Sequence, residues 1–263
     1  MPSQWDNFLG NLGAWQGSFT SVAADGALLE STPSLLELAQ GGEERLVHFS
    51  LKRWGNGMEA PPTREISQEY RSLGRQVVFF ASGCFCKGSL QVAPGTAFGA
   101  EFGFIDADRR HRLVQLHSPE GAFESLVLIR EFRLGSGAAE RPPLRPEDLL
   151  GRWSGQAATI SADWPEPDLE ATELTVQPGG DGALSLHTRL GAREWRSGER
   201  PERLLLLPDG GYCLAPLAVS HREAFTVEAG WSPAPDRLER LIRRYDASGA
   251  WVSATWISAR RSA

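Results

Sequence analysis

The chain has 263 residues, of which 41% are hydrophobic and 23% charged, and its formal net charge is -6. These values are ordinary for a globular protein of one large or two small domains. The negative charge disfavours general binding to nucleic acids or to anionic membranes, which attract basic surfaces. No run of about 18 apolar residues is present, the length that a membrane-spanning helix requires. We therefore expect no nucleic-acid partner and no membrane span.

The start of the chain and its cysteines predict a cytoplasmic protein. Residues 1–6 lack the basic and apolar regions of a secretory signal. Cys84 and Cys86 are too close for an ordinary disulfide within one strand, and Cys213 stands alone. Three sparse cysteines fit a reducing compartment better than secretion. They have no second Cys or His pair at usable spacing, so we predict no metal site.

In chain order, the first predicted element is a short helix capped by Ser3 that runs to about Leu12. A Leu-Gly-x-Trp-x-Gly motif follows at 12–17 and opens a strand-like run. The same motif recurs at 150–155, after a second helical turn that begins with Pro146. This recurrence predicts an internal duplication.

Further along, the two copies align without gaps at an offset of 128 residues, so that Arg112 matches Arg240. The offset between the two motif tryptophans is 138 residues, which means that the second copy lacks about ten residues before its middle strands. Residues 135–146 are rich in Gly, Ala and Pro, as an inter-domain linker should be. We therefore expect one domain at 1–139 and a second at 140–263.

Within each copy, short apolar runs alternate with turn signals, which predicts β-structure. Residues 112–132 are expected to form a hairpin whose counterpart spans 240–257. Asp-Gly turn dipeptides stand at 25–26, 181–182 and 209–210. Many short strands at regular spacing are typical of sandwiches and barrels. We predict an all-β chain of two tandem antiparallel up-and-down β-barrels, each preceded by a short helix.

The motif tryptophans give the fold a more specific interpretation. A short helix and a Gly-x-Trp that opens the first strand resemble the lipocalins and the wider calycin group. In that group the Trp packs across the closed end of the barrel and meets an Arg from the last strand. The resemblance implies structural roles for Trp15 and Trp153. It also implies that Arg130 or Arg133 meets the first Trp, and that Arg260 or Arg261 meets the second.

The chain as a whole resembles an uncharacterised family from cyanobacteria and plastids, a domain-of-unknown-function family built as two lipocalin-like barrels. Four segments carry the resemblance: WDNFLGNLGAWQGSF at 5–19, FGAEFGFIDADRRHRLVQL at 98–116, RPPLRPEDLLGRWSGQA at 141–157 and LIRRYDASGAWVSATWI at 241–257. A neighbouring calycin family contains the bilin lyases, which hold a linear tetrapyrrole and attach it to phycobiliproteins. The resemblance therefore implies a photosynthetic setting and raises the expectation of pigment binding.

The first barrel is the better candidate for a ligand pocket. An eight-stranded barrel is just wide enough to be filled by side chains or to hold one small ligand, and both interpretations stay open. Glu101 is either an inward acid or, if the neighbouring Phe face is the core, a solvated one. Arg109 and Arg110 either clamp a carboxylate or propionate at the mouth or form surface ion pairs. The predicted ligand-binding residues are Phe79, Phe98, Glu101, Phe102, Phe104, Arg109 and Arg110.

The sequence contains no Gly-x-Ser-x-Gly elbow, phosphate loop or His-Glu-x-x-His motif, so we predict no catalytic residue and no resident cofactor. The expected function is a soluble, non-enzymatic binding protein for an elongated apolar ligand such as a tetrapyrrole, carotenoid or fatty acid. One alternative is a bilin-lyase-like pigment-attachment factor that also contacts a photosynthetic protein. The other is an assembly or interaction module whose barrels are both filled. A drug-sized cavity favours the first two functions, and a buried carboxylate or Arg inside it favours pigment attachment.

Overall fold

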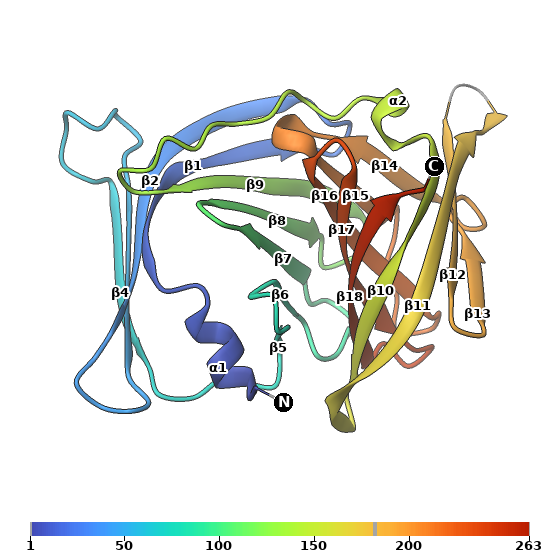
Figure 1. Ribbon diagram of the computed structural model, residues 1–263, viewed down its shortest axis with the longest axis horizontal. Helices are drawn as coiled ribbons and strands as arrows, with labels where there is room; N and C mark the ends of the chain where they lie inside the picture. Colours follow the sequence, from blue (N-terminus) through green and yellow to red (C-terminus); the bar gives the residue numbers. More distant parts are fainter. Residues whose placement is uncertain (1, 181–182, 263) are drawn as a thin grey trace.

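The computed structural model describes residues 2–180 and 183–262, and it consists of two curled antiparallel sheets of nine strands each. Each sheet follows one short helix, and the two sheets lie side by side (Figure 1). This architecture confirms the prediction of an all-β chain with two tandem up-and-down barrels. The predicted turn at 181–182 lies outside the described residues.

Helix α1 (Gln4–Leu9) precedes the first sheet, and the Ser3 hydroxyl caps it by accepting the Asp6 backbone N–H at 3.2 Å. The helix is shorter than predicted because Gly10, a poor helix former, ends it. The first sheet contains β1 (Gly13–Ala23), β2 (Leu28–Gln40), β3 (Val47–Arg53), β4 (Arg64–Tyr70), β5 (Val77–Phe79), β6 (Phe85–Gly88), β7 (Phe98–Asp106), β8 (Arg109–His117) and β9 (Phe123–Arg133). Its strand order is β4-β3-β2-β1-β9-β8-β7-β6-β5, so the first and last strands pair and the sheet has edges at β4 and β5.

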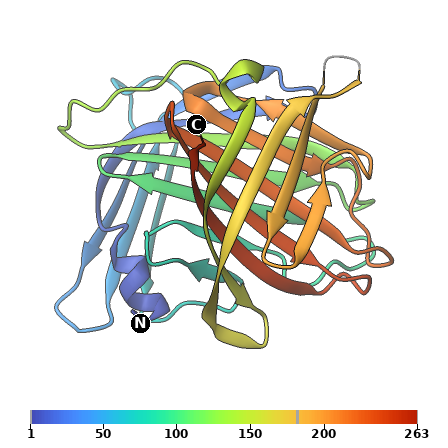
Figure 2. The ribbon, with the colours of Figure 1, turned by 45° about the vertical axis from the view of Figure 1, so that its right-hand side comes forward.

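The second sheet repeats this topology. Helix α2 (Pro146–Leu149) leads into β10 (Gly151–Ser161), β11 (Trp164–Pro178), β12 (Leu184–Leu190), β13 (Arg193–Arg196), β14 (Glu202–Leu206), the short 3-10 helix η2 (Pro208–Gly210), β15 (Gly211–Pro216), β16 (Phe225–Ala234), β17 (Arg237–Tyr245) and β18 (Trp251–Arg261). The strand order is β13-β12-β11-β10-β18-β17-β16-β15-β14. The view of Figure 2 brings these strands forward. Within the described ranges, no helix is long and apolar enough to cross a membrane.

The residues that the second copy lacks come mainly from one hairpin. In the first sheet, β3 and β4 are joined by a loop at 54–63, whereas a tight turn at 191–192 joins the equivalent strands β12 and β13. Gly191 has a φ of +54°, the left-handed conformation that glycine adopts most readily in tight turns. The shorter turn accounts for most of the difference between the two sequence offsets.

One tryptophan and one arginine close each barrel at the same place. Trp15 is fully buried, and its indole N–H donates to the Asn11 carbonyl at 3.0 Å. The Arg133 guanidinium carbon lies 4.4 Å from the centroid of the Trp15 ring, and that of Arg261 lies 4.2 Å from the centroid of Trp153. These are cation–π contacts. Of the two arginines expected for each tryptophan, the structure thus places the later one over the ring.

The cluster with the most buried apolar residues lies between the barrels, where the outer faces of β7, β8 and β9 pack against those of β15 to β18 (Figure 1). Phe98 packs edge-on against Phe225 and Tyr245, with ring centroids 5.5 and 5.2 Å apart. Main-chain hydrogen bonds such as Phe123 N–H to the Leu217 carbonyl, at 2.9 Å, also join the two barrels. Strands in this region are therefore buried on both faces, with one face toward the barrel interior and the other toward the second barrel.

The two barrel interiors differ in packing. Leu174, Val176, Leu186, Ile242 and other apolar residues of one continuous cluster fill the second barrel. The interior cluster of the first barrel gathers around α1, where Trp5 and Phe8 pack with Phe79 and Phe85. The remainder of the first interior is hollow, and this cavity is the candidate site.

Candidate functional site

The first barrel contains a cavity of about 500 Å³. Its walls come from α1, from strands in both halves of the curled sheet and from the connection between the edge strands β4 and β5. Aromatic side chains dominate the lining and include Phe8, Phe19, Phe49, Tyr70, Phe79 and Phe85. Both the volume and the apolar walls are typical of pockets that hold small molecules, which span roughly 300–1,000 Å³.

Four charged side chains from β6, β7 and β8 line one wall of this cavity, and Glu131 on β9 pairs with two of them. Glu131 binds Arg112 through both carboxylate oxygens at 3.1 and 2.9 Å and also binds Arg110 at 3.0 Å. Glu101 accepts from Arg112 at 2.8 Å and from Lys87 at 3.3 Å. We refer to these five residues as the charged wall.

Burial and neighbouring charges act against each other on Glu101, Arg112 and Arg110. Burial alone would raise the pKa of Glu101, but the charges of Arg112 and Lys87 outweigh burial and lower it. For Arg112, burial is outweighed by Glu131 and Glu101, which raise its pKa. For Arg110, burial dominates and lowers the pKa to about 10, with Glu131 as a partial offset. All three groups are therefore charged at neutral pH.

Three of the predicted ligand-binding residues line the cavity: Phe79, Glu101 and Arg110. The structure does not bring the other four to it. Phe98, Phe102 and Phe104 alternate with Glu101 as predicted, but they face the second barrel and belong to the inter-barrel cluster. Arg109 also points away, and pairs with Asp209 of the second barrel.

The glycines of strand β7 serve packing inside the barrel. A Cβ on Gly103 would lie only 2.1 Å from the ring of Phe85, so the missing side chain makes room for that aromatic residue. In the second barrel, Gly230 leaves the same space for Tyr212, where a Cβ would lie 1.9 Å from the ring. Glycine inside a strand often marks a bulge or the close approach of a ligand, whereas these two glycines accommodate a neighbouring ring.

The second barrel carries a smaller version of the charged wall that sequence reasoning missed. Glu228 binds Arg240, accepts from the Tyr212 hydroxyl at 2.5 Å, and lies with both partners inside the packed interior. Strand pairing shows that Arg240 is equivalent to Arg112 of the first barrel. Arg112 pairs with Gly103 on the neighbouring strand, and Arg240 pairs in the same way with Gly230. The match of Arg112 to Arg240 in the sequence repeat is the signal that could have identified them.

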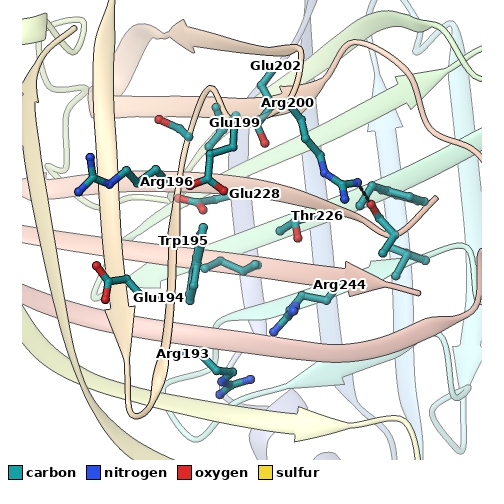
Figure 3. A pocket seen from close by; sticks show the side chains of 16 residues that line it. Arg193, Glu194, Trp195, Arg196, Glu199, Arg200, Glu202, Thr226, Glu228 and Arg244 are labelled. Atoms are coloured by element: carbon teal, nitrogen blue, oxygen red, sulfur yellow. Dashed lines mark hydrogen bonds between the residues drawn. The ribbon is translucent and has the colours of Figure 1, made fainter. Parts of the chain in front are cut away.

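The mouth of the second barrel forms a smaller pocket of about 380 Å³ (Figure 3). Trp195 lies in its centre, with Arg193 and Arg244 on one side and Glu228 on the other. Acidic and basic side chains alternate around its rim, and the packed core closes its floor. This pocket therefore presents a charge-balanced surface rather than an apolar chamber. In the described part of the chain, no group of three His, Cys, Asp or Glu side chains is arranged to hold a metal ion.

The comparison with protein families agrees with the two-barrel organisation. The N-terminal domain of the family described as domain of unknown function DUF3598 matches residues 1–136. The family described as "Biogenesis factor required for ATP synthase 1, C-terminal domain" matches residues 140–262. A crystal structure of a DUF3598 protein of unknown function from Nostoc punctiforme is 38% identical, covers 100% of both chains and superimposes with a TM-score of 0.91. The chain belongs to the DUF3598 family. This finding confirms the predicted membership in an uncharacterised family with a cyanobacterial relative.

Other solved structures are far less similar. A putative outer membrane protein from Bacteroides fragilis shares 8% identity over 99% of this chain and 100% of its own, with a TM-score of 0.30. The S-type phycobiliprotein lyase CPES from Guillardia theta shares 11% identity over 97% and 90%, with a TM-score of 0.19. Scores this low carry no information on the function of this DUF3598 protein. A search of the curated proteins finds no match.

Proposed function

We propose that this DUF3598 protein is a binding protein that holds an elongated apolar ligand inside its first barrel. The observation that carries the proposal is the cavity of about 500 Å³ with aromatic walls. The second barrel has the same topology, but an apolar cluster fills much of its interior, and its pocket of about 380 Å³ is lined by equal numbers of acidic and basic side chains. Burial of apolar ligand surface against these walls would supply the free energy of binding.

Glu101 and Arg110 place a carboxylate and an arginine in the cavity wall, which is the feature expected of a pigment-attachment factor. The charge state of that carboxylate nevertheless favours binding without chemistry. A pigment-attachment reaction needs a group near the reacting atom that gives or takes a proton. Glu101 is the carboxylate that lines the cavity, and Arg112 and Lys87 lower its pKa, so it is a poor proton donor at neutral pH and a weak base. The ligand classes to test are tetrapyrroles, carotenoids and fatty acids.

The experiment is a titration of the purified protein with biliverdin, haem, a carotenoid and palmitate, followed by tryptophan fluorescence. Val114→Phe adds bulk to the cavity wall and should weaken binding at least about tenfold. Val252→Phe, at a site that is 42% exposed on the second barrel, is the matched control and should bind as the wild type does. Phe49→Trp is a second cavity-filling variant. Saturable binding unaffected by both filling variants, or no binding of any class, would refute the proposal.

A second candidate function is a helper in the assembly of a multisubunit complex. The match of residues 140–262 to the C-terminal domain of a biogenesis factor required for ATP synthase favours it. A packed second barrel fits a domain that acts through its surface. Size-exclusion chromatography with individual purified ATP synthase subunits tests this role directly. Co-elution with one subunit supports the role, and separate elution from every subunit argues against it.

A further inference from the structure

The two barrels carry different residues at one pair of equivalent interior positions. Arg110 on β8 pairs in register with Glu131 on β9. In the second barrel, Leu238 on β17 pairs in the same register with Ala259 on β18. All four side chains are buried, with exposures of 3%, 0%, 0% and 4%, respectively. The hollow barrel thus holds an ion pair where the filled barrel holds two apolar residues.

Arg110 is incompletely satisfied by the protein. Its Nη2 pairs with Glu131 at 3.0 Å, but its Nε and Nη1 are buried without a hydrogen-bond partner among the described residues. Its guanidinium carbon lies 4.9 Å from the centroid of Trp15, so the cation also rests on that ring. Buried donors without partners are costly, which makes such a group in a cavity wall a candidate for a ligand contact.

The charged wall as a whole has an excess of positive charge. It combines Lys87, Arg110 and Arg112 with two carboxylates, Glu101 and Glu131. In the second barrel, one carboxylate balances one arginine at the corresponding place. Beyond the pair that both barrels share, the first barrel adds the Arg110–Glu131 ion pair and Lys87, which Leu214 replaces in the second barrel. The net charge of the charged wall is therefore positive by one, and Arg110 lines the cavity directly.

We infer that the ligand of the first barrel is an amphiphile with one carboxylate group, and that this carboxylate accepts hydrogen bonds from Arg110 while the apolar remainder fills the aromatic part of the cavity. This inference rests on the proposed binding function and specifies its ligand class. A carboxylate supplies both the missing negative charge and acceptors for the free guanidinium N–H groups. Fatty acids carry one such group, whereas biliverdin and haem carry two propionates and hydrocarbon carotenoids carry none.

The test compares two probes of equal chain length, dodecanoate and dodecanol, by isothermal titration calorimetry. We expect the wild-type protein to bind dodecanoate at least about tenfold more tightly than dodecanol, the effect of one charge-assisted hydrogen bond. Arg110→Leu introduces the residue that the second barrel has at this position. This variant should keep its affinity for dodecanol and lose the preference for the carboxylate. Arg260→Leu, which removes the same charge from an exposed site, should retain the preference.

Each outcome decides one of the two proposals. Equal affinities of the wild-type protein for the two probes would overturn the carboxylate inference and leave the apolar binding function intact. A preference for dodecanoate that persists in Arg110→Leu would also overturn it. No binding of either probe would argue against the binding function itself. If Arg110→Leu does not fold, the double variant with Glu131→Ala copies both residues of the second barrel and replaces it.

Discussion

Glu228 holds Arg240 through both carboxylate oxygens, at 2.8 and 3.0 Å, in the centre of the second barrel. The equivalent pair in the first barrel is Glu101 and Arg112, joined at 2.8 Å. The pair is present in a barrel that is filled and in a barrel that is hollow. Its shared role is therefore to tie neighbouring strands of the curled sheet together, and ligand contact is left to the residues that differ between the barrels.

Removal of the carboxylate from the second barrel should be severely destabilising. Glu228→Gln keeps the size of the side chain but leaves the buried Arg240 charge without its partner. Loss of one member of a buried ion pair costs about 3–5 kcal/mol, so we expect a loss of that size in the free energy of unfolding in urea.

An exposed ion pair provides the control. Asp236 and Arg260 approach to 2.7 Å, but both side chains are more than half exposed, at 61% and 69%. Asp236→Asn should change the free energy of unfolding by less than about 1 kcal/mol. Equal effects of Glu228→Gln and Asp236→Asn would show that the interior pair contributes no more than a surface contact.

The last glycine of each repeated motif should be intolerant of a side chain. A Cβ on Gly155 would lie 2.0 Å from the Ser258 carbonyl oxygen, and one on Gly17 would lie 1.9 Å from the Arg130 carbonyl oxygen. Backbone cannot move aside as a flexible side chain does, so we expect Gly155→Ala to lower the free energy of unfolding by about 1–3 kcal/mol or more. Gly42→Ala is the control, because a Cβ there meets nothing within 4 Å. Similar melting temperatures of the two variants would contradict the close approach of β10 and β18.

Much of the fold could be predicted because the duplicated sequence contains the same motif and the same order of strand and turn signals in both copies. The Leu-Gly-x-Trp-x-Gly motif marks the place where β1 and β10 begin and where Trp15 and Trp153 close the barrels. The glycine requirement at Gly17 and Gly155 explains why the motif recurs intact. The predicted hairpins coincide with β8–β9 and β17–β18, since turn residues and strand alternation are local signals.

The cavity wall could be predicted only in part. The alternation of side chains along β7 correctly places Glu101 on the opposite face from Phe98 and Phe102, but it does not determine which face points into the barrel. The usual assumption that the aromatic face is the interior fails here, because the second barrel covers the outer face of β7. The contact between Arg110 and Glu131 depends on the register of β8 against β9. A hairpin turn normally sets this register, but the pairing shifts between Leu116 and His117, and the sequence does not reveal that shift.

The three cysteines should report on separation of the barrels, because Cys84, Cys86 and Cys213 all lie in the inter-barrel cluster. Burial raises the pKa of Cys84 to about 12, and it also raises the pKa of the other two thiols. At pH 8 we expect the native protein to react with a thiol reagent at least about 100-fold more slowly than the urea-unfolded protein. Asp163→Cys adds an exposed thiol as the positive control. Rapid labelling of a native cysteine would show that the barrels separate readily.

The acid sensitivity of the protein should depend on Asp209, which joins the barrels through Arg109 and through His111 at 3.3 Å. Asp209 also accepts the backbone N–H of Arg141 at 2.9 Å. Burial would raise the pKa of Asp209, but the hydrogen bonds from His111 and Arg141 and the charge of Arg109 outweigh it and lower the pKa. Because the folded-state pKa is depressed, the unfolded chain takes up the proton first as the pH falls. Asp209 therefore contributes stability above its ordinary pKa, and this stability disappears as the pH falls through the folded-state value.

Asp209→Asn should for this reason cost about 2 kcal/mol at pH 7 and progressively less below about pH 4. Urea unfolding at pH 7, 4 and 3 measures this difference between the variant and the wild type. The surface variant Asp236→Asn should again stay within about 1 kcal/mol of the wild type at pH 7. A constant difference between Asp209→Asn and the wild type across the three pH values would mean that the carboxylate charge does not hold the barrels together. The remaining contribution would then come from the shape of the Asp209 side chain and from the apolar contacts around it.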